Sequence, residues 1–224
     1  KKVAPGTQNF CRGPAMTRGQ AVQAIEGGIA LAEGEAAAGS DLIGLGEMGI
    51  GNTTAASAIT AALTGAPVEA VTGRGTGIDE AAWERKVAII RQALAVNRPD
   101  PDDAMDVLAK VGGFEIAGLV GVVLAGAAAR IPVVVDGFIA GAAALVAVKL
   151  KDEVRHFLLA SHCSAEPGHR VILEHLGLRP YLDLEMRLGE GTGAALAFVL
   201  IQAAVKIYTE MATFKSAGVS GKQP

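Results

Sequence analysis

The stretch from Gly44 to Thr54, GLGEMGIGNTT, carries four glycines and ends in a run of side-chain oxygens at the start of an alanine-rich segment. Glycine lets a backbone turn with positive φ or approach a ligand closely. Asn52, Thr53 and Thr54 add oxygens and free N–H groups at the start of the following helix, where an anion is well held. The stretch therefore predicts a phosphate-binding loop, although the same residues also suit a tight strand-to-helix turn without a ligand.

The first three glycines of this loop also have the GxGxxG spacing of dinucleotide-binding loops, and Glu69 follows about twenty residues later as a possible ribose ligand. Glu47 lies inside the loop, where its carboxylate would face the charges of a pyrophosphate. A nucleotide with one phosphate therefore fits the loop better. An oxidoreductase that depends on NAD or NADP stays as an alternative, based on this spacing alone.

Composition indicates a small-molecule partner. The 224 residues, half of them hydrophobic, can bury the core of one domain, and the net charge of −3 argues against nucleic-acid binding. The uncharged run 116–129 has fourteen residues, fewer than the roughly twenty that span a membrane. Cys11 and Cys163 are too few for a disulfide framework. We therefore expect a cytoplasmic protein that does not bind membranes.

Hydrophobic periodicity and turn residues predict strands that alternate with helices. We expect strands at 41–45, 67–72, 131–135, 156–160 and 181–184. We expect helices at 17–39, after the glycine loop, from 79 to before Pro99, from 102, and at 112–129, 138–149, 165–176 and 194–211. This order predicts the α/β class, with a Rossmann-like doubly wound, mostly parallel sheet that has helices on both faces, and part of a smaller helical domain.

Polar or glycine-rich loops follow the expected strands in the segments GEMGIGNTT, GRGTG, DGF, SHCSAE and RLGEGTG. The carboxyl ends of parallel strands meet at one edge of a sheet, so these loops predict a single site. Asp136 suits either ribose hydroxyls or the N-cap of the helix that follows it. His162, His169 and Cys163 lack the further ligands or partners that a metal site or a nucleophilic cysteine needs, so we expect a polar turn there.

Six segments in the same order resemble the nicotinate-nucleotide:dimethylbenzimidazole phosphoribosyltransferase family of cobalamin biosynthesis. They are GEMGIGNTTAA, GRGTGID, VGGFEIAGL, PVVVDGF, SAEPGH and RLGEGTGAALA. The resemblance covers nearly the whole chain, and PGTQNF and RGPAMT extend it to the beginning. Gly13 in RGPAMT stands where the family has a glutamate. Family members also carry a segment before the one that matches Lys1, which supplies part of the benzimidazole pocket and of the smaller helical domain.

The resemblance implies an enzyme that transfers phosphoribose from nicotinate mononucleotide to 5,6-dimethylbenzimidazole. The products are nicotinate and α-ribazole 5′-phosphate, and neither a metal nor a cofactor is implied. The family's general base falls on Glu190. Its contacts to the substrates fall on Glu47, Gly49, Asn52, Thr53, Gly75, Lys86, Asp136, Gly137, Ser164, Arg187 and Leu188.

The residues themselves agree with the role of Glu190. A benzimidazole attacks C1′ through one ring nitrogen while the other carries a proton, and a carboxylate beside that N–H can take the proton. Glu190 lies between two glycines and can approach a flat ring, although a loop glutamate is commonly a solvated charge. Lys86, in the middle of a helix, is singled out by the resemblance alone. A module that binds nicotinate mononucleotide without turnover stays as a further alternative.

The resemblance also implies a homodimer and a division of the chain. We expect 1–14 to be a lead-in or linker, 15–224 to be the Rossmann-like catalytic domain, and the last helix, about 194–218, to contribute to a small helical domain. The first and last helices are expected to leave apolar faces partly uncovered, which favours association. These faces include Ile25, Ile29, Phe198 and Ile201.

Overall fold

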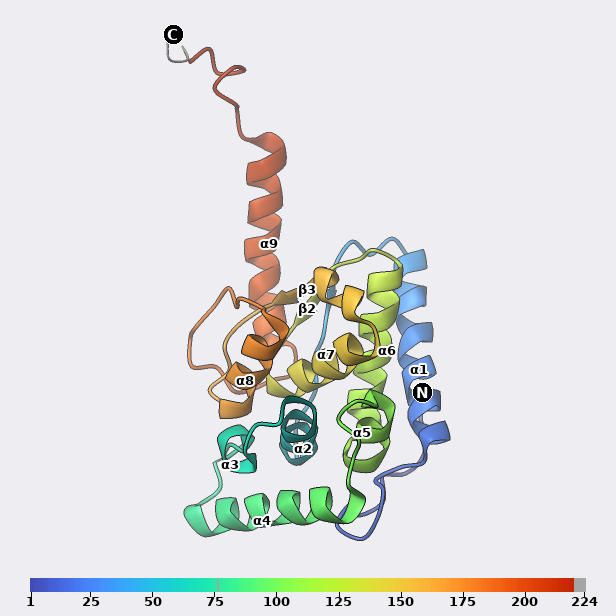
Figure 1. The fold of residues 1–224 in the computed structure, drawn as a ribbon. Coiled ribbons are helices and arrows are strands. Elements are labelled where there is room, and N and C mark those ends of the chain that lie inside the picture. Colours follow the sequence, from blue (N-terminus) through green and yellow to red (C-terminus); the bar gives the residue numbers. More distant parts are fainter. Residues whose placement is uncertain (76, 220–224) are drawn as a thin grey trace.

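The computed structural model describes residues 1–75 and 77–219, so Thr76 of the GRGTG segment lies outside the described residues. Helices surround a small parallel sheet, and the last helix reaches well beyond them (Figure 1). The helices are α1 (Arg18–Ala37), α2 (Asn52–Thr64), α3 (Val68–Val71), α4 (Glu80–Asn97), α5 (Ala104–Val111), α6 (Phe114–Ala128), α7 (Phe138–Leu150), α8 (Pro167–Leu176) and α9 (Thr192–Glu210), with a 3-10 helix at Asp152–Phe157. The strands are β1 (Ile43–Gly44), β2 (Val133–Val135) and β3 (Leu158–Ala160).

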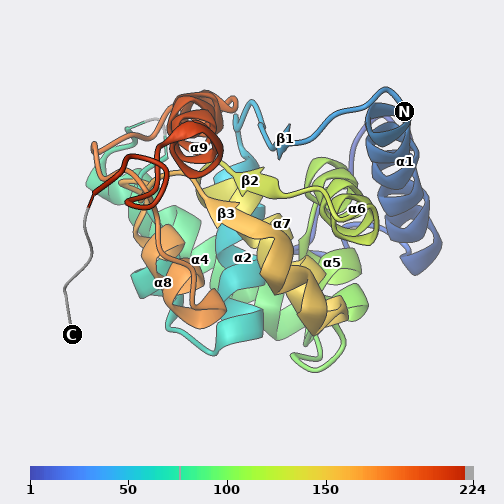
Figure 2. The same ribbon diagram turned by 90° about the horizontal axis from the view of Figure 1, so that it is seen from above.

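The sheet has the order β1-β2-β3, and both strand pairs are parallel. In β2, Val133 and Val135 belong to the main helical core, whereas Val134 packs with Ala194 and Ala197 of α9. Alternate residues of a strand point to opposite faces, so β2 is buried from both sides. Figure 2 shows α9 on one face of the strands and α7 and α2 on the other. The expected α/β class with helices on both faces is confirmed.

The centre of the core is α7, a helix of small and branched apolar residues. Ten of its thirteen residues are buried, because α2, α6 and α8 pack around it. A helix that is apolar on all sides is stable only when it is covered on all sides. Since α7 begins directly after β2 and Asp136-Gly137, this core fixes the end of the strand where the site is expected.

The helices α1 and α6 pack at backbone distance through glycines. A Cβ at Gly28 would lie 1.9 Å from the Gly118 carbonyl oxygen, and a Cβ at Gly121 would lie 2.0 Å from the Ile25 carbonyl oxygen. Ile25 is consequently buried, with 7% of its surface exposed, and Ile29 packs against the core. The expectation that these residues of the first helix lack part of their cover is wrong for Ile25, which packs against α6, whereas Ile29 is only partly buried, as expected.

Several helix starts follow the caps that the sequence indicates. Thr17 and Gln20 form the reciprocal capping box of α1. Asp79 accepts a hydrogen bond from the Ala82 N–H at the start of α4, and Asp103 caps α5 in the same manner. Within 1–14, Val3, Phe10 and Cys11 are partly buried against the main core.

Every expected strand is shorter in the structure or absent, and β1 and β2 cover only part of 41–45 and 131–135. The segment 67–72 is the helix α3, because Val68 and Val71 are buried at helical spacing and the Thr72 hydroxyl donates to the Val68 carbonyl. The strand expected at 156–160 begins at 158, after the 3-10 helix. The strand expected at 181–184 is reduced to a single bridge between His162 and Leu182.

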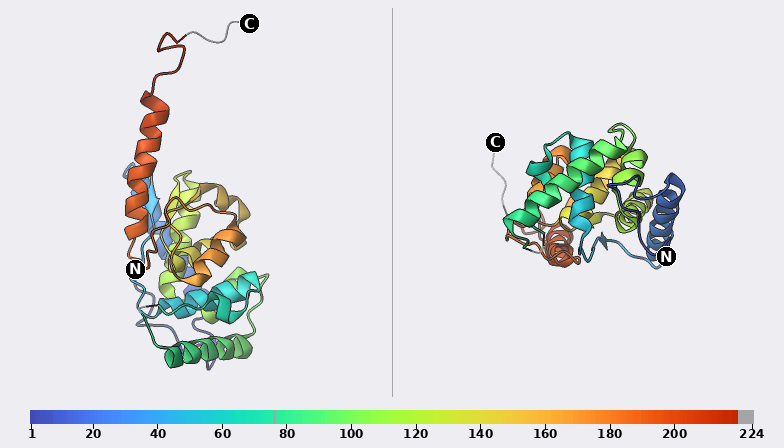
Figure 3. Two further views of the ribbon diagram at one scale, coloured as in Figure 1. Left: turned by 90° about the vertical axis from the view of Figure 1, so that its left-hand side faces the viewer. Right: turned by 90° about the horizontal axis from the view of Figure 1, so that it is seen from below.

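The last helix is covered only at its beginning. Gly193, Ala194 and Ala197 are buried, Phe198 and Ile201 are partly covered, and every residue from 202 to the end of α9 is exposed. The helix ends at Glu210, before the expected 218, and extends well beyond the other helices and the sheet (Figure 3). Among the described residues, α9 alone is long and apolar enough to cross a membrane by length and composition, which is weak evidence for a span.

Gly28→Ala should destabilise the fold, because its Cβ would meet a backbone carbonyl of α6 and force the two helices apart. We expect the free energy of unfolding to fall by about 1–3 kcal/mol. Gly34→Ala is the matched control, because Gly34 lies in the same helix and a Cβ there would have no described atom of a neighbouring element within 4 Å. That control should gain roughly 1 kcal/mol from helix propensity. Urea unfolding measures both, and equal effects of the two variants would contradict the tight α1–α6 packing.

Candidate active site

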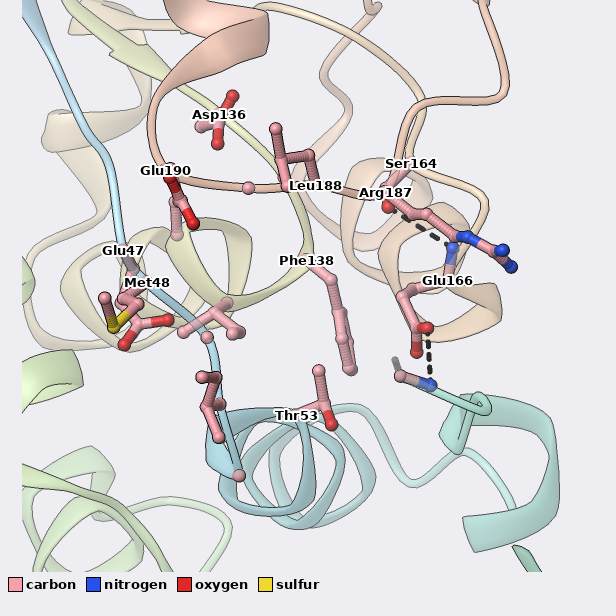
Figure 4. Close-up of a pocket in the computed structure, with 18 of the residues that line it drawn as sticks. Glu47, Met48, Thr53, Asp136, Phe138, Ser164, Glu166, Arg187, Leu188 and Glu190 are labelled. Carbon is pink, nitrogen blue, oxygen red and sulfur yellow. Dashed lines mark hydrogen bonds between the residues drawn. The ribbon is translucent and has the colours of Figure 1, made fainter. Parts of the chain in front are cut away.

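A pocket of about 700 Å³ opens where the loops after the three strands meet the start of α2. Its walls come from 47–51, 53–54, 74–75, 78, 136–140, 187–190 and the side chains of Lys86, His162, Ser164 and Glu166. Figure 4 shows Glu190 and Glu47 on one side, Glu166 on the other, and Phe138 between them. The predicted convergence of the strand-end loops on a single site is therefore present in the structure.

The glycine-rich loop contacts the loop of Glu190 at backbone distance. A Cβ at Gly46 would lie 2.9 Å from the Gly191 nitrogen, and the Glu190 N–H donates to the Glu47 carbonyl at 2.9 Å. Gly49 and Gly51 have φ of 89° and 88°, in the left-handed region. Gly46 is thus needed for a close approach, and the other two for the turn into α2.

Asp136 accepts three hydrogen bonds from the backbone that follows Glu190. Its Oδ1 accepts from the N–H groups of Gly193 (2.7 Å) and Ala194 (3.1 Å), and its Oδ2 accepts from Gly191 (3.0 Å). The residue is only 2% exposed. The sequence interpretation that Asp136 caps the helix directly after it is wrong, although Asp136 does cap a helix. That helix is α9, 55 residues or more along the chain, and not α7, which follows directly.

Glu190 itself is exposed at the pocket rim, with φ of 58°. Its neighbours Gly189 and Gly191 have φ of 79° and 78°, so three consecutive residues are left-handed. This turn leaves the carboxylate free, because none of the hydrogen bonds among the described residues involves its oxygens. Leu188 and Met48 lie beside it and are 63% and 70% exposed.

Glu47 is the second carboxylate on this side of the pocket. Its Oε1 accepts a hydrogen bond from the Asn52 side chain, and its buried Oε2 has no partner among the described residues. Burial raises the pKa of Glu47, and the Asn52 hydrogen bond opposes that rise. Asn52 does not line the pocket itself but holds Glu47 from behind.

The opposite end of the pocket carries positive charge. Lys86 Nζ donates to Thr53 Oγ1 at 2.8 Å and to the Gly73 carbonyl at 3.1 Å, which brings α4 against the start of α2. Burial lowers the pKa of Lys86, and the negative charge of Glu166 opposes that change. Glu166 Oε1 accepts from the Gly75 N–H at 2.9 Å, while its Oε2 is buried without a partner among the described residues.

Two buried histidines support the loop that contains Ser164. His169 Nδ1 accepts a hydrogen bond from the Ser164 N–H at 3.0 Å, and burial lowers the pKa of His169 to about 3. His162 lies at the pocket wall beside Asp136, and burial lowers its pKa also. Neither histidine belongs to a metal-type group of His, Cys, Asp or Glu within the part of the chain that the structure describes.

Nearly all of the residues that the sequence assigns to the site line this one pocket. They are Glu47, Gly49, Thr53, Gly75, Lys86, Asp136, Gly137, Ser164, Arg187, Leu188 and Glu190. Sequence reasoning missed Glu166 and Phe138 and treated His162 as part of a turn. The SHCSAE and DGF segments contain them, but no spacing rule distinguishes these side chains from their neighbours.

Glu69 forms an ion pair with Arg91 and lies outside the pocket lining, so it does not take the ribose position of a dinucleotide fold.

Comparisons with known proteins agree on one family. A family model described as "Phosphoribosyltransferase" matches residues 1–219. A curated relative from Desulforudis audaxviator, a nicotinate-nucleotide–dimethylbenzimidazole phosphoribosyltransferase, is 61% identical over 220 residues, which are 98% of this chain and 62% of the relative. The relative of the same name from Geobacter metallireducens is 63% identical over 219 residues, again 98% and 62% of the two chains.

A solved structure shares the fold over the same part of the chain. The crystal structure of CobT from Thermus thermophilus superposes with a TM-score of 0.93 at 51% identity, covering 98% of this chain and 65% of that one. The chain thus spans about 62% of the length of the curated relatives named above.

Asp136→Asn should loosen the start of α9, because the amide keeps one acceptor but sets an NH₂ group against the Gly191 N–H. Hydrogen bonds to a charged group contribute about 1.5–3 kcal/mol each, so we expect a loss of roughly 3 kcal/mol in the free energy of unfolding. Hydrogen exchange of the amides at 191, 193 and 194 should quicken. Asp183→Asn, an exposed change nearby, is the control, and equal unfolding midpoints for the two variants would refute the role of Asp136.

Acid should destabilise the fold through His169. The unfolded chain binds a proton near pH 6.5 and the folded chain only near pH 3, so the unfolded state holds more protons between these values. Stability therefore falls as pH falls below 6.5, by about 1.4 kcal/mol per pH unit for this group, or roughly 2 kcal/mol between pH 6.5 and 5.

Unfolding curves measured between pH 7.5 and 5 test the role of His169. In His169→Asn the side-chain oxygen can still accept from the Ser164 N–H but does not titrate, so the slope should become shallower. His175→Asn, at an exposed position of the same helix, should keep the slope. An unaltered slope in His169→Asn would show that the acid sensitivity has another origin.

Proposed function

Because this chain belongs to the nicotinate-nucleotide–dimethylbenzimidazole phosphoribosyltransferase family, we propose that the whole protein transfers phosphoribose from nicotinate mononucleotide to 5,6-dimethylbenzimidazole. The observation that carries the proposal is one pocket with the Glu190 carboxylate at its rim, unpaired among the described residues, and the Lys86–Thr53 pair at its other end. The products are nicotinate and α-ribazole 5′-phosphate.

The Glu190 carboxylate at the rim is suited to 5,6-dimethylbenzimidazole, the molecule that accepts the phosphoribosyl group. One benzimidazole nitrogen attacks C1′, the bond from C1′ to the nicotinate nitrogen breaks, and its electron pair neutralises the pyridinium ring. The proton on the other benzimidazole nitrogen passes to Glu190, which acts as general base. Leu188 and Met48 give the flat base apolar neighbours, and Arg187 lines the same rim. Attack from the side opposite nicotinate inverts C1′.

The basic end of the pocket suits the 5′-phosphate. Lys86 supplies a positive charge and Thr53 a hydroxyl at the first turn of α2, where helix geometry favours an anion. Gly49 and Gly75 bring backbone close to the same space, and Ser164 lies on the neighbouring loop. Glu47, with its raised pKa, and Gly137 complete the contacts that we assign to the nucleotide. Asn52 acts through Glu47.

We infer a Rossmann-like catalytic domain over 15–224, preceded by the lead-in 1–14, with α9 contributing to a small helical domain. The exposed apolar face of α9, which includes Leu200, Val205 and Tyr208, supports association into a homodimer. The negative charge and the two free cysteines suit the cytoplasm.

Glu190→Gln tests the mechanism in the full-length protein. The amide keeps the shape of the side chain but cannot take the proton, so turnover should fall by about a hundredfold to ten-thousandfold. Nucleotide affinity should persist, because the change lies at the opposite end from Lys86. Raising the pH should restore part of the rate if deprotonation of the benzimidazole is the step affected. The measurement is single-turnover formation of α-ribazole phosphate across a pH series.

Glu185→Gln is the matched control, since Glu185 is exposed, also has a positive φ, and lies outside the pocket lining. It should keep the wild-type rate. Wild-type turnover in Glu190→Gln would exclude Glu190 as the base and direct attention to Glu47. Nucleotide binding without any turnover in the wild type would favour the binding-module alternative.

A further inference from the structure

His162 is a buried residue of the pocket wall to which the proposed reaction gives no task. It follows β3 and Ser161 and is only 1% exposed. The start of α9 packs tightly on its ring, because a Cβ at Gly193 would lie 2.1 Å from Nδ1. The imidazole is therefore held in one orientation, with one edge towards α9 and Asp136.

The hydrogen bonds of Ser161 determine which ring nitrogen carries the proton. Ser161 Oγ donates its only proton to the Asp136 carbonyl oxygen at 2.8 Å, and it lies 3.0 Å from His162 Nδ1. A hydroxyl whose proton is already used can only accept, so Nδ1 must donate. Asp136 Oδ1 lies 3.9 Å from Nδ1, beyond hydrogen-bond distance, and places negative charge on the same side as the Nδ1 proton. His162 is thus the Nδ1–H tautomer.

The other nitrogen, Nε2, then presents a lone pair and no proton. A Cβ at Gly137 would lie 3.6 Å from His162 Nε2 and 3.9 Å from the Ser164 Cβ. All three residues line the pocket wall. Within the described residues no donor reaches Nε2. Burial lowers the pKa of His162, which keeps the ring neutral near pH 7. The pocket therefore contains a fixed, uncharged hydrogen-bond acceptor.

An acceptor with no proton selects the group that can bind it. The phosphate and the nicotinate carboxylate are acceptors themselves and would be repelled by the lone pair. The donors that nicotinate mononucleotide offers are its two ribose hydroxyls. A nucleotide with C1′ near Glu190 and its phosphate near Lys86 must place its ribose between those ends, where Gly137 and Ser164 line the wall.

We propose that His162 Nε2 accepts a hydrogen bond from a ribose hydroxyl of the nucleotide and makes the pocket selective for ribose over deoxyribose. The assignment rests on the proposed function for the identity of the nucleotide. His162 then contributes to binding and specificity, while Glu190 performs the proton transfer. Ser161 acts through His162, because its hydroxyl fixes the tautomer.

The test compares the affinities of the full-length protein for nicotinate mononucleotide and for its 2′-deoxy and 3′-deoxy analogues. Calorimetry reports a dissociation constant that does not depend on the folded fraction. In the wild type, loss of the bonded hydroxyl should weaken binding by roughly tenfold. In His162→Phe the dissociation constants of nicotinate mononucleotide and of the analogue that lacks the bonded hydroxyl should lie within about twofold of each other. His162→Gln, whose side-chain oxygen can replace Nε2 as acceptor, should retain most of the discrimination.

Ser161→Ala keeps the ring and removes the group that fixes its tautomer, so discrimination should decrease there too. The assignment would be overturned if the ratio of the affinities for the ribose and deoxyribose nucleotides were the same in the wild type, in His162→Phe and in Ser161→Ala. So would a defect in His162→Phe that appears only in affinity for dimethylbenzimidazole, since its N–H is the competing donor. Failure of the wild type to bind nicotinate mononucleotide would remove the proposed function as well, whereas binding without turnover would leave this assignment standing.

Discussion

The carboxylate of Asp136 is the constraint on which the arrangement of the site depends. It lies at the end of the central strand, β2, and accepts hydrogen bonds from two N–H groups in the first turn of α9 and from the N–H of the residue after Glu190. Beyond Ala197 no residue of α9 is buried, and only Phe198 and Ile201 are partly covered. A buried charge with three donors therefore connects the rigid core to the loop that carries the proposed base. Removal of either partner would leave a charge or several N–H groups without compensation.

The pocket is built from loops whose backbones contact one another directly. The glycine-rich loop meets the Glu190 loop at Gly46 and Gly191, where a Cβ at Gly46 would lie 2.9 Å from the Gly191 nitrogen. Such contacts leave no room for side chains, which explains why glycines recur in the segments that identify the family. The loops after β1 and β2 lead directly into α2 and α7, which pack against each other, so this part of the pocket gains its shape from the core.

Much of this arrangement could be predicted from the sequence, because periodicity and caps are local signals. The β2 strand and the capping box at Thr17 are examples. The remainder depends on tertiary contacts. Val68 and Val71 are two branched residues that suit a strand, yet burial of both on one side makes a helical turn. The helix that Asp136 caps is not its neighbour in sequence. Glu166 was missed because its partner N–H belongs to a distant loop.

The left-handed turn at Glu190 has a consequence for how this position can evolve. Glutamate in that conformation costs about 1–2 kcal/mol relative to glycine, and glycines on both sides already share it. A glycine at 190 would therefore suit the backbone better than the residue that is present. Selection for a more stable chain and selection for a carboxylate at the rim act in opposite directions at this residue. Glu185 has the same left-handed conformation outside the pocket, so the backbone cost points to function at Glu190 only because this carboxylate stands at the pocket rim.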